Sequence, residues 1–258
     1  GVLQMEDDTP FPSIEIFEIL TSTLDSIHQA AGEGAPEWTT HIAREQTRGR
    51  GQQARPWWSP SGAGLWMSTL LRPSTPRKTW GGIALVAGAA TRSALESLGV
   101  KAVELRWPND LYVDSRKLGG ILAESRSLST GAWISLGIGI NIDLESGELR
   151  KEAPEGLSDT IICLREAGPP SESEPEIIAL RILEELRSLY KRFQRGEALA
   201  ELLGESLCLE GRKVSVERSG EVALLGTATG LGNNGELLVA DEEGNIHQIV
   251  TAGVSWDV

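Results

Sequence analysis

Two long segments of this sequence repeat apolar residues at helical spacing. The first lies at 76–98, and Gly99 follows it where a C-cap glycine belongs. The second lies at 176–194 and carries one apolar stripe that ends before Gly196. The pattern predicts two amphipathic helices, each of which buries one face against the rest of the fold.

Shorter segments with strand patterns lie before and between these helices. They alternate apolar and polar residues or form short apolar runs bounded by glycine, proline or aspartate. The predicted strands cover 39–45, 64–72, 103–107, 111–113, 118–124 and 133–142. Short helices are expected after Ser22 and Thr23, which have N-cap chemistry, around Ile161, and at 198–203. This mixture predicts an α+β fold, a mixed sheet with flanking helices.

After Gly204 the sequence changes to short β runs separated by turns. The runs cover 213–217, 221–229, 236–240 and 246–250. We expect a domain boundary near Ser206 and a small β-barrel-like module after it. The predicted organisation is a disordered tail at 1–12, a large domain at 13–205 and a small domain at 206–258.

The charge balance argues against several classes of partner. A formal net charge of −13 gives no broad positive surface for nucleic acid or an anionic membrane. Any bound anion must therefore be met by a local group of cations. Cys163 and Cys208 have neither metal nor redox spacing, which favours reduced thiols and a cytoplasmic location. Neither a signal peptide nor a membrane-spanning run is expected.

The segment at 45–60, EQTRGRGQQARPWWSP, combines arginines with glycines. Guanidinium groups and free backbone N–H groups together can bind a phosphate or a carboxylate. Glycine also lets the backbone come close to a ligand. The alternative interpretation is a solvated, flexible surface loop. The residues concerned are Arg48, Gly49, Arg50, Gly51 and Arg55.

A second motif, RWPND at 106–110, is followed by Lys117. Its proline fixes the chain and leaves Asn109 and Asp110 at a turn, where an amide and a carboxylate can contact a nucleotide or its magnesium ion. Lys117 opens the returning strand, so a hairpin would bring a cation and the Asp110 carboxylate into one cleft. The alternatives are a plain turn and a solvent-facing lysine.

In GIGIN at 137–141, two glycines interrupt a predicted strand. Such glycines cost stability and often mark the close approach of a ligand or another backbone. Asn141 would then contact an adenine or a phosphate, whereas packing against a helix is the alternative. Glycine patterns at Gly49 and Gly230 suggest a dinucleotide fingerprint, but no helix is expected after either, and no Walker sequence occurs.

The order and spacing of these motifs resemble those of the biotin protein ligases. That family carries Ser-Thr, then Gln-x-x-Gly-Arg-Gly-Arg-x-Gly-Arg-x-Trp-x-Ser-Pro, Lys-Trp-Pro-Asn-Asp, Lys-x-x-Gly-Ile-Leu-x-Glu and Gly-x-Gly-Ile-Asn. The resemblance extends from Ile14 to the C-terminus, because the family also ends in a small SH3-like β domain. The matching residues are Ser22, Thr23, Gln46, Gly49, Arg50, Gly51, Arg55, Trp57, Ser59, Pro60, 107–110, Lys117, 120–122, Glu124 and 137–141.

The sequence departs from this pattern at four positions. Gln52 replaces the second arginine of Gly-Arg-Gly-Arg, and Ala54 replaces the next glycine. Arg106 replaces the lysine before Trp-Pro-Asn-Asp, and Leu24 replaces a frequent asparagine. The chain resembles the short form of the family, without an N-terminal DNA-binding domain.

The resemblance implies a fold and a reaction. The fold would be a catalytic domain like that of class II aminoacyl-tRNA synthetases, plus an SH3-like barrel. The reaction would be ATP-dependent activation of biotin to biotinyl-AMP and transfer to a lysine of a biotin carboxyl carrier protein, with Mg²⁺. A homodimer is possible, and no nucleic acid or membrane partner is expected. The alternatives are a lipoate-type acyl-protein ligase and a biotin-responsive regulatory protein.

The resemblance also implies roles for individual residues. Lys117 and Arg50 would be catalytic through charge neutralisation, and Asp110 would bind Mg²⁺. The biotin-binding residues would be Ser22, Thr23, Leu24, Gln46, Gly49, Arg50, Gly51, Gln52, Lys117 and Gly120. The ATP-binding residues would be Arg55, Trp57, Arg106, Asn109, Asp110 and Asn141.

Overall fold

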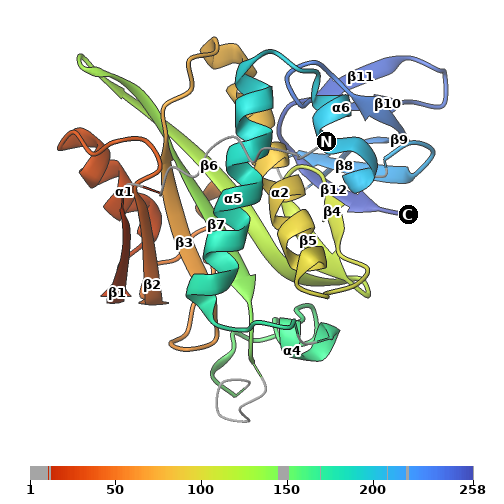
Figure 1. Cartoon of the computed structure of the whole chain (residues 1–258). Helices are drawn as coiled ribbons and strands as arrows, with labels where there is room; N and C mark the ends of the chain where they lie inside the picture. The colour runs from red at the N-terminus through yellow and green to blue at the C-terminus, as the bar shows by residue number, and fades with distance from the viewer. Residues whose placement is uncertain are drawn as a thin grey trace, which may run out of the picture.

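The computed structural model describes residues 11, 13–144, 151–168, 170–207, 209–218 and 221–257. Its larger sheet has seven strands in the order β1-β2-β3-β7-β6-β5-β4 (Figure 1). β1 pairs with β2 in parallel, and the other neighbours pair antiparallel, which confirms the predicted mixed sheet. The strands are β1 (Ile14–Leu20), β2 (Thr40–Gln46), β3 (Gly64–Leu71), β4 (Glu104–Arg106), β5 (Asp110–Val113), β6 (Arg116–Leu128) and β7 (Gly131–Asn141).

Helices α2 (Ile83–Ser97) and α5 (Pro175–Gln194) pack together and cover one face of this sheet (Figure 1). Side chains alternate between the two faces of a strand, so every second residue of β3 and β7 faces these helices. Met67, Leu71 and Ile138 are among those buried with them in one core. Both predicted long helices are thus confirmed.

Helix α1 (Thr23–Gly32) packs on the opposite face of the sheet. Its buried residues Ile27 and Ala31 contact Leu70 and Trp133, which alternate with the residues of the main core. Beyond α1, the same face of the sheet carries small residues, including Gly137 and Gly139. It therefore has room for a pocket.

The first long helix differs from the prediction at its start. The predicted helix at 76–98 begins as a 3-10 segment, Arg77–Gly82, and Gly99 follows α2 with a φ of +96°, as expected of a C-cap glycine. The short helix at 198–203 is confirmed as α6 (Leu199–Leu203).

The prediction of a helix around Ile161 is wrong. Ile161 forms a parallel bridge with Lys117, and the helix α4 lies further on, at Leu164–Ala167. The Lys117 N–H donates to Thr160 O at 2.9 Å, and the Ile162 N–H donates to Lys117 O at 3.0 Å. Pairing with the sheet thus overrides the local preference of this segment.

A second sheet follows after α6, with its strands in the order β11-β10-β9-β8-β12. The prediction missed its last strand, and closure into a barrel and the boundary near Ser206 stay predictions. The buried indole of Trp107 donates to Gly235 O at 2.8 Å and joins this sheet to the first. No described helix is long and apolar enough to span a bilayer. The strands are β8 (Lys213–Arg218), β9 (Glu221–Leu231), β10 (Leu237–Ala240), β11 (Ile246–Ile249) and β12 (Gly253–Trp256).

Candidate active site

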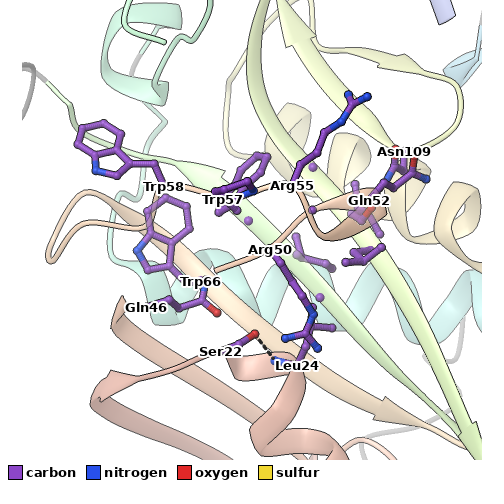
Figure 2. A pocket seen from close by; sticks show the side chains of 18 of the residues that line it. Ser22, Leu24, Gln46, Arg50, Gln52, Arg55, Trp57, Trp58, Trp66 and Asn109 are labelled. Atoms are coloured by element: carbon purple, nitrogen blue, oxygen red, sulfur yellow. Dashed lines mark hydrogen bonds between the residues drawn. The ribbon is translucent and has the colours of Figure 1, made fainter. Parts of the chain in front are cut away.

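A cavity of about 270 Å³ lies on the face of the sheet that carries α1 (Figure 2). The start of α1, the segment after β2, and strands β5 to β7 surround it. Trp57, Trp58 and Trp66 lie along one side, and Arg55 points away from Ser22 and Gln46 (Figure 2). The predicted site residues that line this cavity are Ser22, Thr23, Leu24, Gln46, Arg50, Gly51, Gln52, Arg55, Trp57, Asn109, Asp110, Lys117, Gly120 and Asn141.

The start of α1 and the end of β2 form a polar corner of this pocket. Ser22 caps the helix, with its Oγ accepting from the Leu24 N–H at 3.3 Å (Figure 2). Gln46 Oε1 accepts from the Thr23 N–H at 2.9 Å, and Gln46 Nε2 donates to Ser59 Oγ at 2.9 Å. The Ser-Thr pair and the glutamine, 23 residues apart, thus meet in one hydrogen-bonded group.

The glycines of β6 and β7 make room for two side chains above them. A Cβ on Gly137 would lie 3.0 Å from Leu24 Cδ2, and one on Gly139 would lie 2.8 Å from Trp57 Nε1. A Cβ on Gly120 would likewise lie 3.2 Å from the Trp57 ring. The groups that approach the glycines of GIGIN are thus the side chains of Leu24, on helix α1, and of Trp57. The buried Trp57 Nε1 is without a hydrogen-bond partner in the part of the chain that the structure describes.

Lys117 lines the pocket from the start of β6. Its Nζ is 2.8 Å from Asp110 Oδ1 and 5.0 Å from the centroid of the Trp57 ring. The predicted hairpin does bring the cation and the carboxylate into one cleft. Asn141 Nδ2 donates to Lys117 O at 3.4 Å and to Ile162 O at 3.1 Å, which fixes the backbone of this lysine.

Arg50 lies between two carboxylates at the pocket wall. Its Nε and Nη2 donate to Glu124 at 2.8 and 2.7 Å, and its Nη1 and Nη2 donate to Asp25 at 2.9 Å each. These bonds, first those with Glu124 and then those with Asp25, raise the pKa of Arg50 above its ordinary value. Bonds from Arg50, and secondly from His28, lower the pKa of Glu124 to about 2. The cation is firmly held, and it is permanently charged.

Two predicted site residues, Gly49 and Arg106, do not line the cavity. The Arg106 guanidinium donates to Glu104 at 3.0 and 3.2 Å and stacks 4.2 Å from the Tyr112 ring. These neighbours on one face of the β4–β5 pair draw it along the strand and away from Asp110. A Cβ on Gly49 would lie 2.5 Å from Trp57 O, so this glycine allows the loop to close on itself.

Asn109 lines the cavity, but its amide has a structural partner. Its Nδ2 donates to the carbonyl of Ile121 on β6, and its own backbone carbonyl accepts from the Ile121 N–H at 2.8 Å. The turn of RWPND is therefore tied to the strand that carries Lys117 and Gly120. This contact fits the turn interpretation of the motif, and any contact of Asn109 with a nucleotide stays a prediction.

Comparison with known proteins places these motifs in a family. The model of the "Biotin/lipoate A/B protein ligase family" matches residues 18–141. "Bifunctional ligase/repressor BirA" of Bacillus spizizenii is 30% identical over 92% of this chain and 72% of its own length. "Biotin--[acetyl-CoA-carboxylase] ligase" of Mycobacterium tuberculosis is 29% identical over 90% of this chain and 84% of its own length. The chain belongs to the biotin protein ligase family.

Solved biotin protein ligase structures agree with this assignment. The enzyme from Aquifex aeolicus in complex with biotin and ATP has a TM-score of 0.77 and 28% identity, over 95% of this chain and 99% of that chain. The enzyme from Leishmania major in complex with biotinyl-5-AMP has a TM-score of 0.60 and 25% identity, over 93% and 99%. The α+β architecture predicted for a biotin protein ligase is confirmed.

Several residues that line this biotin protein ligase pocket, or hold its side chains, were not predicted from the sequence. Asp25 and Glu124, the partners of Arg50, were not among the predicted site residues, although Glu124 belongs to the family motif. Apolar side chains from separate parts of the chain also line the cavity, among them Trp66, Leu157 and Ile161.

Proposed function

We propose that this chain activates biotin with ATP to biotinyl-AMP and then transfers the biotinyl group to a lysine of a biotin carboxyl carrier domain. One observation carries the proposal. A single cavity combines a polar corner, an apolar wall and the ammonium group of Lys117, and the polar corner and Lys117 come from motifs of the biotin protein ligases. Such a cavity suits a small acid with a polar ring system and an apolar chain.

In this proposal, biotin lies between the polar corner and Lys117. Ser22, Thr23 and Gln46 supply donors and acceptors for its ring, and Leu24 and Trp66 contact its apolar parts. Its carboxylate lies near Lys117 Nζ and within reach of Arg50. Two cations on either side of the reacting oxygen would stabilise the charge that develops there.

ATP binds beside biotin, along Gln52, Arg55 and Trp57. The indole of Trp57 offers a flat face, which suits stacking with a nucleotide base. Among the described residues no three His, Cys, Asp or Glu side chains group as a metal site. Asp110 would therefore hold Mg²⁺ together with the phosphates, as this ion often binds beside nucleotides. Mg²⁺ would neutralise phosphate charge.

The reaction then needs no protein nucleophile. A carboxylate oxygen of biotin attacks the α-phosphorus of ATP, the bond to the β-phosphate oxygen breaks, and pyrophosphate leaves. The amine of the acceptor lysine next attacks the carbonyl carbon of the mixed anhydride, and AMP leaves with the electron pair. Lys117 and Arg50 act by positioning and charge neutralisation.

We assign the carrier domain of a biotin-dependent carboxylase as the partner and the cytoplasm as the location. The net charge of −13 does not favour nucleic acid as a partner. Because one relative is named a ligase and repressor, binding to DNA should still be tested. A homodimer remains compatible with the fold. Sedimentation of the chain with and without biotin and ATP would decide its oligomeric state.

The main test uses labelled biotin, ATP, Mg²⁺ and a purified carrier domain. We expect release of pyrophosphate and label on the target lysine, and no label on a carrier domain in which that lysine is arginine. Lipoate in place of biotin tests the other activity named in the family description. Folded protein that releases no pyrophosphate with biotin, but does so with lipoate, would refute the proposed substrate.

A further inference from the structure

A chain of polar groups runs from the core to Arg50 at the pocket wall. Trp133 Nε1 donates to His28 Nδ1 at 3.0 Å, and His28 Nε2 lies 3.3 Å from Glu124 Oε2. Glu124 in turn accepts two hydrogen bonds from Arg50. We infer that His28 is a positioning residue for biotin activation, because it holds the guanidinium of Arg50 in place through Glu124. This inference rests on the proposed function.

Trp133 decides which nitrogen of His28 carries the proton. An indole N–H can only donate, so Nδ1 must accept, and the proton of the neutral ring lies on Nε2. That proton is directed at the Glu124 carboxylate. The His28 side chain is only 1% exposed, so its bonds are shielded from water. The ring therefore fixes the rotation of the carboxylate that receives Arg50.

The two carboxylates that hold Arg50 are not equivalent. Glu124 is backed by His28, and its side chain is 28% exposed, whereas Asp25 is 51% exposed. Asp25 also has a second cation nearby, because Arg126 Nη2 lies 3.8 Å from its Oδ1. If Arg50 releases Asp25, the Asp25 carboxylate therefore still has Arg126 as a partner. Glu124 is therefore the fixed partner of the guanidinium, and Asp25 is the partner that a substrate can replace.

This difference matters because Arg50 has few donors to spare. A guanidinium carries five N–H groups. Glu124 and Asp25 accept from four of them, which leaves one on Nη1. If Asp25 gives way to a substrate anion, two more N–H groups become available. The guanidinium then keeps its orientation only if Glu124 is itself held, which is the role of His28.

The test is a double-mutant cycle of His28→Leu and Glu124→Gln in the full chain. It measures kcat and KM for biotin and ATP from pyrophosphate release. We expect His28→Leu to lower kcat/KM roughly tenfold in the wild-type background, since catalysis depends steeply on position. In the Glu124→Gln background the same change should have little further effect, because His28 acts through that carboxylate.

Two variants serve as controls for the loss of a buried histidine. His28→Gln keeps an N–H that can reach Glu124, so it should restore most of the rate. His41, on β2, is another buried histidine, and it does not line the cavity. It contacts α1 through its Nδ1, which lies 2.6 Å from Ser26 Oγ. His41→Leu removes this contact. It should leave kcat/KM unchanged.

The outcomes separate this inference from the proposed function. Additive losses in the cycle, or an equal loss in His41→Leu, would assign His28 to stability alone. If His28→Leu does not fold, Trp133→Phe, which removes the donor to Nδ1, replaces it in the same cycle. A wild-type chain that releases no pyrophosphate overturns the proposed function instead. In that case calorimetry compares the affinities of the wild type and His28→Leu for biotin, which needs no turnover. Equal affinities would overturn the role of His28.

Discussion

Lys117 Nζ lies 2.8 Å from Asp110 Oδ1, across the hairpin of β5 and β6. The centroid of the Trp57 ring lies 5.0 Å from the same ammonium nitrogen. Both neighbours come from motifs that are separate in the sequence. The contacts hold the cation at one point of the cavity, while both charged side chains remain more than a quarter exposed and open to a substrate.

We predict that Lys117→Ala lowers kcat/KM for pyrophosphate release by roughly a hundredfold or more, as loss of a preorganised electrostatic group does. The midpoint of thermal unfolding should change little, because a partly exposed ion pair contributes only about 0 to 1 kcal/mol. Asp110→Asn keeps the ammonium group and should retain more activity than Lys117→Ala at saturating Mg²⁺. A Lys117→Ala enzyme with wild-type kinetics would show that the reaction occurs elsewhere.

A second prediction concerns Gly139. The methyl group of Gly139→Ala would lie 2.8 Å from Trp57 Nε1, so the indole must move. We expect a several-fold higher KM for ATP and a loss of about 1 kcal/mol in the free energy of unfolding, as overpacking causes. Steady-state kinetics and urea unfolding measure both. Gly32→Ala, where the added methyl meets no atom within 4 Å, is the control. Equal KM values for the two variants would argue against a role of Trp57 in ATP binding.

The short hairpin explains why one contact could be foreseen and others could not. Asp110 and Lys117 lie on adjacent strands joined by a tight turn, so their proximity follows from the local sequence. Arg50 meets Asp25 and Glu124, which are 25 and 74 residues away in the chain. Such contacts depend on how α1, the segment after β2 and β6 pack together. No local pattern in the sequence predicts that packing.

Glycine motifs were informative in a similarly limited way. The pattern GIGIN indicates a close approach, but the approaching groups, Leu24 and Trp57, come from distant segments that fold over β7.

Arg106 is a residue whose predicted contact does not form. Its motif suggested a ligand contact, yet Glu104 and Tyr112 on the same strand pair attract its guanidinium first. A motif thus specifies which residue is present, while its neighbours in the fold decide where the side chain points.

A third prediction follows from the exchangeable side of Arg50. Asp25→Asn removes a negative charge that competes with substrate for the guanidinium. We expect KM for biotin or ATP to fall about two- to fivefold at low salt, with a smaller effect at high salt because this half-exposed pair is screened. Glu33→Gln removes one charge from the C-terminal end of the same helix and controls for net charge. A raised KM in Asp25→Asn would mean that Asp25 holds Arg50 productively.

The pH dependence of the free energy of unfolding tests the contact between Arg50 and Glu124. In the folded chain the pKa of Glu124 is about 2, against 4.5 for an ordinary glutamate, because Arg50 and then His28 donate hydrogen bonds to it. A lowered pKa means that the folded state binds this proton more weakly than the unfolded state. The stabilisation is therefore complete above pH 4.5, and it is lost as the pH falls from 4.5 to about 2.

We therefore predict that the wild-type chain loses more stability on acidification than Glu124→Gln does. Between about pH 5 and about pH 3 the difference in the free energy of unfolding should be about 1 kcal/mol, after allowance for screening of this partly exposed pair. Urea unfolding at several pH values measures it. Glu96→Gln, which alters an exposed pair with Arg92, should follow the wild type. Parallel curves for the wild type and Glu124→Gln would mean that Glu124 has an ordinary pKa, and that Arg50 is not held as the geometry indicates.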